Sequence, residues 1–428
     1  MTTNEPSYQL LDELLHKCIH CGLCLPVCPT YNLTFQEQSS PRGRIRLMKS
    51  VHEGSLEVTD QFVDEMYFCL DCQACQTACP AGVQYGELVE DARNLISEQG
   101  KEPAAVRFVK AALLNVLISK RRTKLVARLM RLYQKSGLRE AVGESGILSL
   151  FSERLQMKHA LLPMIADEFF DEQIPEIVAV QGERLGRVVF LSGCVMNVAF
   201  PDIHHDAVSL LSKIGYEVVI PKLQECCGSL HGHNGEKEEA KRLARKNIEV
   251  FEKYEFDALI VDSSGCGAFL KEYGRLFSDD KVFADRAEAL SKKIKDITEF
   301  LAGMRMPEPK QSISTRVTYH EACHLVHTQK ISQQPRNLLQ SIPNIEFIEL
   351  PEATWCCGSA GIYNVVRFDD SMKLLQRKIN NLAVTGADVV VTANPGCHLQ
   401  LQCGIKNFKL KMEVMHPVTL LNRAYSLE

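Results

Sequence analysis

The sequence predicts an α/β chain in which a helical, cysteine-rich N-terminal region precedes two copies of one α/β unit. Three observations support this fold class. Eight cysteines form two short runs before residue 80, strands and helices alternate after residue 186, and a Cys-Cys-Gly triplet occurs once in each half of that alternation. The 428 residues are enough for two or three domains, each with its own core.

Composition favours an ordinary globular protein, with 45% hydrophobic and 24% charged residues. A net charge of −4 gives no reason to expect nucleic acid as a partner, and no apolar run approaches the roughly 20 residues of a membrane-spanning helix. The opening "MTTNEPSYQLLDELLHK" lacks the apolar stretch of a secretory signal, so a cytoplasmic location is expected. Because cytosolic thiols are kept reduced, the 17 cysteines predict metal sites rather than disulfides.

The strongest signal is a pair of cysteine runs, each followed by proline. The runs "CIHCGLCLPVCP" and "CLDCQACQTACP" both follow Cys-x2-Cys-x2-Cys-x3-Cys-Pro, the pattern that holds [4Fe–4S] clusters in bacterial ferredoxins. Structural zinc sites typically use two separated Cys-x-x-Cys pairs, which disfavours zinc. Two [4Fe–4S] clusters are therefore predicted on Cys18, Cys21, Cys24, Cys28, Cys69, Cys72, Cys75 and Cys79.

The spacing also predicts crossed ligation. Three thiolates two residues apart wrap one corner of a cubane, whereas the fourth cysteine of each run reaches the other cluster. One cluster is then expected on Cys18, Cys21, Cys24 and Cys79, and the other on Cys69, Cys72, Cys75 and Cys28.

Residues 1–100 are predicted to form a helical ferredoxin-type domain. Phe62 and Met66 recur at helical spacing before the second run, and Leu88 and Ala92 share one face of a helix that follows it. The insert between the runs also carries three arginines. They either neutralise anionic clusters or dock a partner, or else form a solvated basic face: Arg42, Arg44 and Arg46.

Residues 101–185 are predicted to be a helical linker region. The stretch "VRFVKAALLNVLISKRRTKLVARLMRLYQK" is basic and amphipathic, and its apolar run is too short to span a bilayer. Two interpretations are open: the stretch lies against a membrane surface or a partner subunit, or it is an interdomain helix packed on the core.

Beyond residue 186 the chain repeats itself, in units over residues 186–305 and 306–428. Each copy runs from a strand ending in cysteine, through a helix and a strand, to Cys-Cys-Gly, then through a long helix and a strand to Gly-Cys. The alternation predicts parallel sheets, and the cysteines fall at carboxyl ends of strands, where open α/β sheets place ligands. The two sets are Cys194, Cys226, Cys227 and Cys266, and Cys323, Cys356, Cys357 and Cys397.

At least one additional iron–sulfur cluster is predicted on these two sets, because thiolates held close together repel without a metal. The second set is favoured, since its flanks "CCGSAGIYN" and "TANPGC" are rich in glycine, which lets backbone N–H groups approach cluster sulfur. The alternative is that both sets are unmetallated remnants.

The motif "HEACH" matches the His-Glu-x-x-His pattern of zinc proteases, which requires a helix. Here it ends a predicted strand, and Cys323 within it occupies the position of Cys194 in the first copy. No third zinc ligand follows, so the match is interpreted as accidental. His320 and His324 either form hydrogen bonds near cluster sulfur or are satisfied loop histidines.

Paired ferredoxin motifs followed by two Cys-Cys-Gly domains resemble the iron–sulfur subunits of the heterodisulfide reductase and flavin-dehydrogenase group. Within that group, the phrases "SPRGRIRLMK", "SGCGAFLKEYG", "YHEAC", "CCGSAGIYN" and "VTANPGCHLQL" resemble the iron–sulfur subunit of bacterial glycolate oxidase, also called glycolate dehydrogenase. The resemblance runs from about residue 15 to the C-terminus.

The resemblance implies a relay rather than a site of dehydrogenation. A separate flavin (FAD) subunit would oxidise glycolate, and often D-lactate, and this chain would pass electrons to quinone from the inner face of the cell membrane. No Gly-x-Gly-x-x-Gly follows a predicted strand, and no catalytic residue is expected in this chain. Two alternatives remain: a subunit of a related complex (anaerobic glycerol-3-phosphate dehydrogenase or a lactate-utilisation system), or a cluster-binding redox sensor.

The sequence departs from the heterodisulfide reductase pattern at one point. That pattern ends each Cys-Cys-Gly domain in Cys-x-x-Cys, which gives five cysteines per cluster. Here Phe269 and Gln400 stand at the last position, and Cys403 comes three residues late. Each domain keeps four cysteines, which suits an ordinary cluster and makes disulfide reduction doubtful.

Overall fold

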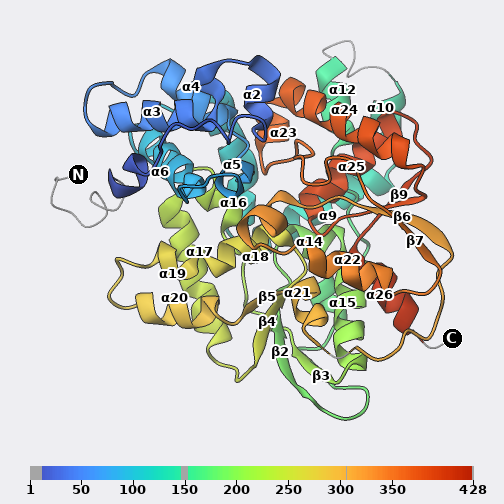
Figure 1. Cartoon of the computed structure of the whole chain (residues 1–428). Helices are drawn as coiled ribbons and strands as arrows, with labels where there is room; N and C mark the ends of the chain where they lie inside the picture. Colours follow the sequence, from blue (N-terminus) through green and yellow to red (C-terminus); the bar gives the residue numbers. More distant parts are fainter. Residues whose placement is uncertain (1–11, 146–152, 305, 427–428) are drawn as a thin grey trace.

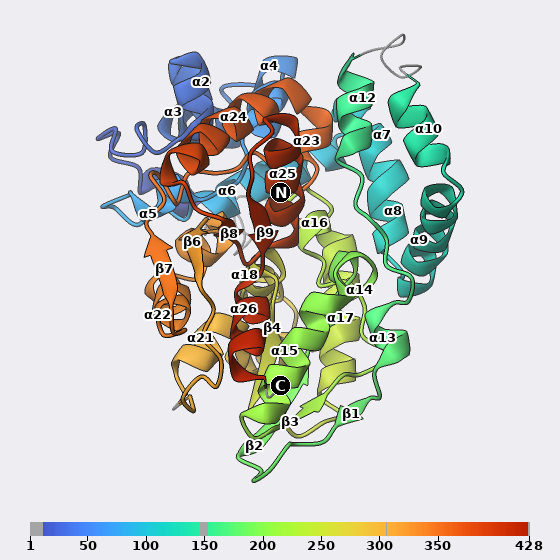
Figure 2. The same cartoon turned by 90° about the vertical axis from the view of Figure 1, so that its right-hand side faces the viewer.

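The computed structural model describes residues 12–145, 153–304 and 306–426. The N-terminal helices, drawn in blue, lie over one end of two α/β units, and the linker helices run along one side of them (Figures 1 and 2). The predicted fold class is confirmed: a helical ferredoxin-like region precedes two α/β units with parallel strands.

The N-terminal region is built from short helices whose ends are set by capping residues. Ser40 accepts a hydrogen bond from the Gly43 amide and Pro41 occupies the first turn, so the longest insert helix begins there. Thr59 caps the next helix in the same way. The helices are α2 (Pro29–Thr34), η1 (Glu37–Ser39), α3 (Pro41–His52), α4 (Asp60–Phe68), α5 (Ala74–Thr77) and α6 (Tyr85–Glu98).

The linker region is helical, as the sequence predicts, and a π-helical turn, η2, interrupts its first helix. None of the helices in the described ranges is both long and apolar enough to cross a membrane. Along α9 the buried side chains include Thr123 and Ala127, whereas Leu125, Leu129 and Leu132 are exposed. The elements are α7 (Ala104–Val109), η2 (Lys110–Leu114), α8 (Asn115–Leu117), α9 (Lys120–Lys135), α10 (Leu138–Glu144), α12 (Glu153–Ala160) and α13 (Phe170–Gln173).

The first α/β unit holds a five-stranded sheet in the order β1-β3-β2-β4-β5. The strands are parallel except β1, which pairs antiparallel with β3 and was not predicted. Val188, Val189, Leu259 and Ile260 are fully buried, because helices cover both faces of the sheet. The strands are β1 (Ile177–Val178), β2 (Gly186–Phe190), β3 (Tyr216–Val219), β4 (Ala258–Val261) and β5 (Ile294–Asp296).

The helices of the first unit are α14 (Val195–Ala199), α15 (Pro201–Lys213), α16 (Ser229–Gly232), α17 (Lys237–Phe251), α18 (Ser264–Lys271), α19 (Tyr273–Leu276), α20 (Ala284–Ser291) and α21 (Ile297–Ala302). In both units, a long helix follows the Cys-Cys-Gly triplet and a shorter one begins beside the last cysteine.

The second unit holds an all-parallel sheet in the order β7-β6-β8-β9. Its strands are β6 (Thr315–Tyr319), β7 (Ile345–Ile348), β8 (Val389–Val391) and β9 (Glu413–Met415). Its helical elements are η3 (His324–Thr328, π-helical), α22 (Gln333–Gln340), α23 (Tyr363–Val366), α24 (Phe368–Thr385), α25 (Pro395–Asn407) and α26 (Pro417–Tyr425).

One hydrophobic core spans both sheets. The C-terminal helix α26 packs against α15 of the first unit, and its Leu421 shares a buried cluster with Phe190 and Val317 from the two sheets. Because this core fixes the units against each other, the loops at the carboxyl ends of β2, β4, β6 and β8 face one common space.

Candidate metal centres

The first candidate centre lies near the surface of the N-terminal region. A small cavity of about 30 Å³ is lined by the first three cysteines of the first run and by the last cysteine of the second, with Cys75 beside them. Burial raises the pKa of Cys24 to about 11, whereas Cys21 is exposed. Crossed ligation assigns the same four residues to one cluster: Cys18, Cys21, Cys24 and Cys79.

Cys28 does not line this first cavity. It is buried, and its sulfur lies 3.3 Å from the Thr30 hydroxyl. Burial, and after it the negative charges of neighbouring thiolates that include Cys28, raises the pKa of Cys72 and of Cys75 well above the usual range. Crossed ligation, which would place Cys28 on the cluster of the second run, stays a prediction.

Arg44 resolves the two interpretations of the arginines. Its side chain is fully buried and donates hydrogen bonds to the Thr30 hydroxyl, the Glu65 carbonyl and the Glu65 carboxylate. Burial disfavours its charge, but the negative charges around it, Cys69 and Cys28 among them, keep the pKa of Arg44 above its usual value. Arg44 therefore neutralises charge beside the second run, while Arg46 is exposed and Arg42 pairs with Glu37.

A second, larger cavity of about 620 Å³ lies between the two α/β units and the N-terminal region. The units meet at its edge, where the Ser264 amide donates to the Ala393 carbonyl and the Gly265 amide donates to the side chain of Asn394. Its lining includes Cys69 and both predicted sets: Cys194, Cys226, Cys227, Cys266, Cys323, Cys356, Cys357 and Cys397.

Within each set, cysteines that are successive in the sequence also have their thiols in contact. Cys194 and Cys226 lie 3.3 Å apart through their sulfurs, and Cys227 contacts both Cys226 and Cys266. In the second set a contact with Cys356, together with burial, raises the pKa of Cys323 well above its usual range. A thiol whose pKa is raised stays protonated unless a cation compensates the charge. Contacts with Cys194 and Cys227 instead lower the pKa of Cys226 well below its usual range. Thiols of both kinds fit iron, whose binding displaces the protons that remain.

Glycine shapes both Cys-Cys-Gly loops. Gly228 and Gly358 have φ angles of +89° and +88°, a backbone conformation that side chains with a Cβ rarely adopt. The Gly358 amide points at the Cys356 sulfur at 3.4 Å, as the glycine-rich flank predicts. A backbone N–H in this position stabilises a thiolate that ligates a cluster.

The two units differ in the group that holds the loop before the triplet. In the first unit, Asn247 of α17 accepts from the Glu225 amide, just before the triplet, and donates to the Cys226 carbonyl. In the second, Lys378 of α24 is fully buried and donates to the carbonyls of Glu352 and Ala353. Burial lowers the pKa of Lys378 to about 8, although nearby thiolates oppose the shift, so the second set has a buried cation beside it.

The positions of the missing fifth cysteines are filled by residues with structural roles. Phe269 packs against Gly232, where a Cβ would come within 2.5 Å of the ring. Gln400 donates to the Ser371 hydroxyl and accepts from Asn364. Cys403 is buried beside Asn407 and does not line the central cavity, so neither unit regains a fifth cysteine among the described residues.

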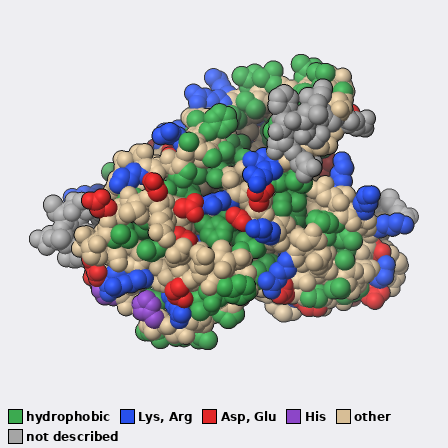
Figure 3. All heavy atoms as spheres, turned by 90° about the horizontal axis from the view of Figure 1, so that it is seen from above, with side chains coloured by type: hydrophobic (Ala, Val, Ile, Leu, Met, Phe, Trp, Pro, Cys, Tyr) green, Lys and Arg blue, Asp and Glu red, His purple; other side chains and the backbone are tan. Residues whose placement is uncertain are grey.

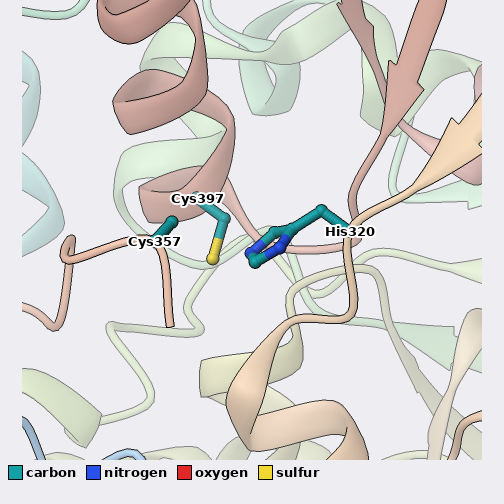
Figure 4. A group of neighbouring side chains, drawn as sticks. All are labelled: His320, Cys357 and Cys397. Atoms are coloured by element: carbon teal, nitrogen blue, oxygen red, sulfur yellow. The ribbon is translucent and has the colours of Figure 1, made fainter. Parts of the chain in front are cut away.

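The two histidines of "HEACH" are not held together on a helix. His324 donates from Nε2 to the Asp71 carbonyl at 3.1 Å, and its ring packs against His233. His320 lies instead beside Cys357 and Cys397, with one ligand atom of each residue within 4.8 Å of the others (Figure 4). By distance and angle neither ring nitrogen of His320 has a full hydrogen bond among the described groups, although the Ala353 carbonyl lies close enough to the ring to act on its pKa.

The environment of His320 disfavours its charged form. The residue is 1% exposed, and burial, with Lys378 as a second cause, lowers the pKa of His320 well below its usual range despite the nearby Ala353 carbonyl. A buried nitrogen without a partner typically costs about 1–3 kcal/mol.

Comparison with known proteins matches three parts of the chain to described families. Residues 14–83 match the 4Fe-4S dicluster domain, residues 188–271 and 317–402 match the cysteine-rich domain, and residues 105–162 match the "Glycolate oxidase iron-sulfur subunit, linker region". The "Probable glycolate oxidase iron-sulfur subunit" of Bacillus subtilis (strain 168) is 40% identical over 438 residues, covering 99% of each chain. The chain belongs to the family of glycolate oxidase iron–sulfur subunits.

Other relatives agree with this membership. The "Glycolate oxidase iron-sulfur subunit" of Escherichia coli (strain K12) is 30% identical over 401 residues, covering 91% of this chain and 90% of that one. "Lactate utilization protein A" of Halalkalibacterium halodurans is 30% identical over 230 residues, 54% of this chain and 93% of that one. This member of the glycolate oxidase iron–sulfur family is thus an iron–sulfur electron-transfer subunit, with 4Fe-4S clusters in its N-terminal region.

Sequence reasoning missed a buried ionic network between this subunit's N-terminal region and its first α/β unit. His233 lies between the carboxylates of Glu90 and Asp71, and Arg275 pairs with Glu90. Burial opposes the charge, but Glu90 and Asp71 raise the pKa of His233 to about 9. Asp71, Glu90 and His233 come from separate segments of the chain. In the sequence, the position of Asp71 inside the "CLDC" motif is the one sign of this network.

Proposed function

We propose that this chain relays electrons within a flavin-dependent glycolate dehydrogenase complex. A separate FAD subunit oxidises glycolate, and also D-lactate, to the 2-oxo acid, and this chain carries the electrons to membrane quinone. Glycolate oxidase subunits match the chain over its whole length, whereas lactate utilization protein A matches about half of it, and this favours glycolate over the related complexes. Because the dehydrogenation belongs to the partner, no residue here is assigned as catalytic.

The observation that carries this proposal is the continuity of the cysteine sites. Cys72 of the second run, Trp355 and Cys356 share one buried cluster, and Cys323 packs against it. Cys69 of the same run lines the central cavity. Electrons would therefore pass from a first-run cluster on Cys18, Cys21, Cys24 and Cys79 to one on Cys69, Cys72, Cys75 and Cys28. From there they would pass to a further cluster on the thiols that line the central cavity, with the second set favoured.

We place the site at which quinone would accept electrons on the side of the central cavity that the linker helices cover. Val109, Leu113 and Leu117 give the central cavity an apolar wall there. The outer face of α9 exposes leucines beside Arg121, Arg122 and Arg128, an arrangement suited to an anionic lipid surface. Seen from above, exposed hydrophobic and basic side chains are interspersed on the molecule (Figure 3). A peripheral position on the inner face of the cell membrane would bring quinone to this wall.

The proposal is tested with anaerobically purified chain, mixed with or without the flavin subunit encoded by a neighbouring gene. The chain should contain at least eight irons and eight acid-labile sulfides. Glycolate should reduce the clusters, as seen by electron paramagnetic resonance, only when the flavoprotein is present. Clusters that stay oxidised with glycolate and flavoprotein, but are reduced through a glycerol-3-phosphate dehydrogenase subunit, would reassign the chain to the related complex.

A controlled outcome separates the relay from a redox sensor. Addition of a short-chain quinone to the glycolate-reduced complex should reoxidise the clusters. A chain that purifies with full cluster content but neither binds the flavoprotein nor reduces quinone would support the sensor instead.

A further inference from the structure

The two α/β units place different side chains at one equivalent backbone position. Leu191 and His320 each stand three residues before the first cysteine of their set. The Leu191 amide donates to the Ile260 carbonyl of β4, and the His320 amide donates to the Val391 carbonyl of β8. Because β2 pairs with β4 as β6 pairs with β8, the two side chains leave the same point of the two sheets, and both line the central cavity.

The environment of the second position is built for a ligand rather than for packing. His320 comes from the end of β6, Cys357 from the glycine-rich loop and Cys397 from the start of α25, so three separate segments converge (Figure 4). Each offers one ligand atom within 4.8 Å of the other two. The ring is almost completely buried, and the Ala353 carbonyl is the one described group close enough to act on it as a hydrogen-bond acceptor, which leaves a ring nitrogen for a metal. Leucine fills the equivalent position in the first unit without leaving a polar atom unsatisfied.

We propose that His320 binds iron through a ring nitrogen in a cluster held by Cys323, Cys356, Cys357 and Cys397. The histidine is then the fifth protein ligand of the second set, so this cluster differs from an ordinary cubane with one cysteine on each iron. The first set, with leucine at this position, has four cysteine ligands alone. The inference rests on the proposed cluster in the second set. It makes the two units chemically different, with one cluster carrying an imidazole and any cluster in the other unit lacking one.

Iron bound through imidazole is recognised by its nitrogen hyperfine coupling, which a cluster with thiolate ligands alone lacks. The intact chain is expressed once with natural histidine and once with ¹⁵N-labelled histidine. Its clusters are reconstituted anaerobically and reduced, and they are then examined by pulsed electron paramagnetic resonance. The strong nitrogen coupling should change from the ¹⁴N to the ¹⁵N pattern. This measurement needs no substitution, so it does not depend on whether a variant folds.

Two matched variants assign the coupling to a residue. His320→Leu installs the residue that the first unit already has, and should abolish the coupling while the signals of the two ferredoxin-type clusters persist. His324→Leu removes the other histidine of the same motif, which also lines the cavity, and should leave the coupling in place.

The outcomes separate this inference from the proposal on which it rests. An iron content that stops at eight would remove the cluster and with it the role of His320. A cluster on the second set without nitrogen coupling would overturn the histidine ligand alone, and would leave a ring that turns one N–H toward the Ala353 carbonyl. Coupling lost in the His324 variant but kept in the His320 variant would overturn the assignment as well.

Discussion

Replacing Arg44 by methionine should weaken the N-terminal region more than any exposed substitution on the same helix. Arg44 and Glu65 form an ion pair at 3.2 Å, with 0% and 7% of the two side chains exposed. The variant loses three hydrogen bonds, and among the described residues the Ser39 hydroxyl is then the one donor left to the Glu65 carboxylate. Removal of one partner from such a buried pair typically costs about 3–5 kcal/mol.

The cost translates into local opening of α3 and α4. At about 1.4 kcal/mol for each tenfold change, hydrogen-exchange protection of these helices should fall by roughly 140- to 3,700-fold. Exchange is measured by mass spectrometry on the cluster-loaded protein, because local opening is reversible where global unfolding of a cluster protein is not. Arg46→Met, an exposed substitution on the same helix, should change protection by less than about twofold to threefold.

A double variant tests the reason for the loss. Arg44→Met combined with Glu65→Gln removes the uncompensated charge, so it should recover part of the protection that Arg44→Met loses. A decrease of less than tenfold in the single variant, or a double variant worse than the sum of the two single variants, would refute the view that a buried ion pair holds the two helices.

Three further predictions follow from the sites. Cys28→Ser should alter the paramagnetic signal of the cluster formed mainly by the second run; a change confined to the first-run cluster would show that ligation is not crossed. The pKa of His233 is raised to about 9 beside Glu90, above an unfolded value of about 6.5. Its stabilising contribution is therefore complete below about pH 6.5 and is lost as the pH rises through 9. Exchange protection of α6, corrected for the intrinsic rate, should fall across that window, and Glu90→Gln should flatten the dependence; equal profiles would contradict the pairing. Lys378→Met removes a buried cation and should lower the reduction potential of the second-set cluster, measured by potentiometric titration against Lys373→Met, an exposed-side control on the same helix.

Much of the fold is predictable because its signals are local. Cysteine spacing, helical periodicity and the repeated Cys-Cys-Gly triplet each lie within short stretches, and they predict the helical region and both parallel sheets. The short strands β5 and β9 escape such reasoning because each has only three residues, two of which are charged in β5 and one in β9, so neither forms an apolar run of recognisable length. Their position is decided by pairing with β4 and β8, which are distant in sequence.

The candidate sites likewise include residues that local sequence patterns predict and residues that only the folded chain brings together. The cysteines are readable from spacing, but the burial of Arg44 is not, because an arginine-rich segment ordinarily lies on a solvated face. The contrast between His320 and Leu191 is visible once the copies are aligned, yet the convergence with Cys357 and Cys397 depends on three loops meeting in space. His233 and Glu90 meet only because the N-terminal region packs on the first unit.

The cysteine thiols differ in solvent exposure, and this difference has a consequence for how the clusters withstand oxygen. Cys21 lies at the surface, whereas Cys28 and three cysteines of the second run, Cys69, Cys72 and Cys75, are between 6% and 8% exposed. The central cavity holds half-buried thiols, Cys194, Cys266 and Cys323, beside Cys357, which is 1% exposed. Oxidation of cysteine follows exposure, so damage by oxygen should begin at the thiols of the first run and should reach the fully buried thiols last. A cell that meets a brief pulse of oxygen would then lose the entrance of the relay first, while the innermost thiols persist as the part from which repair can start.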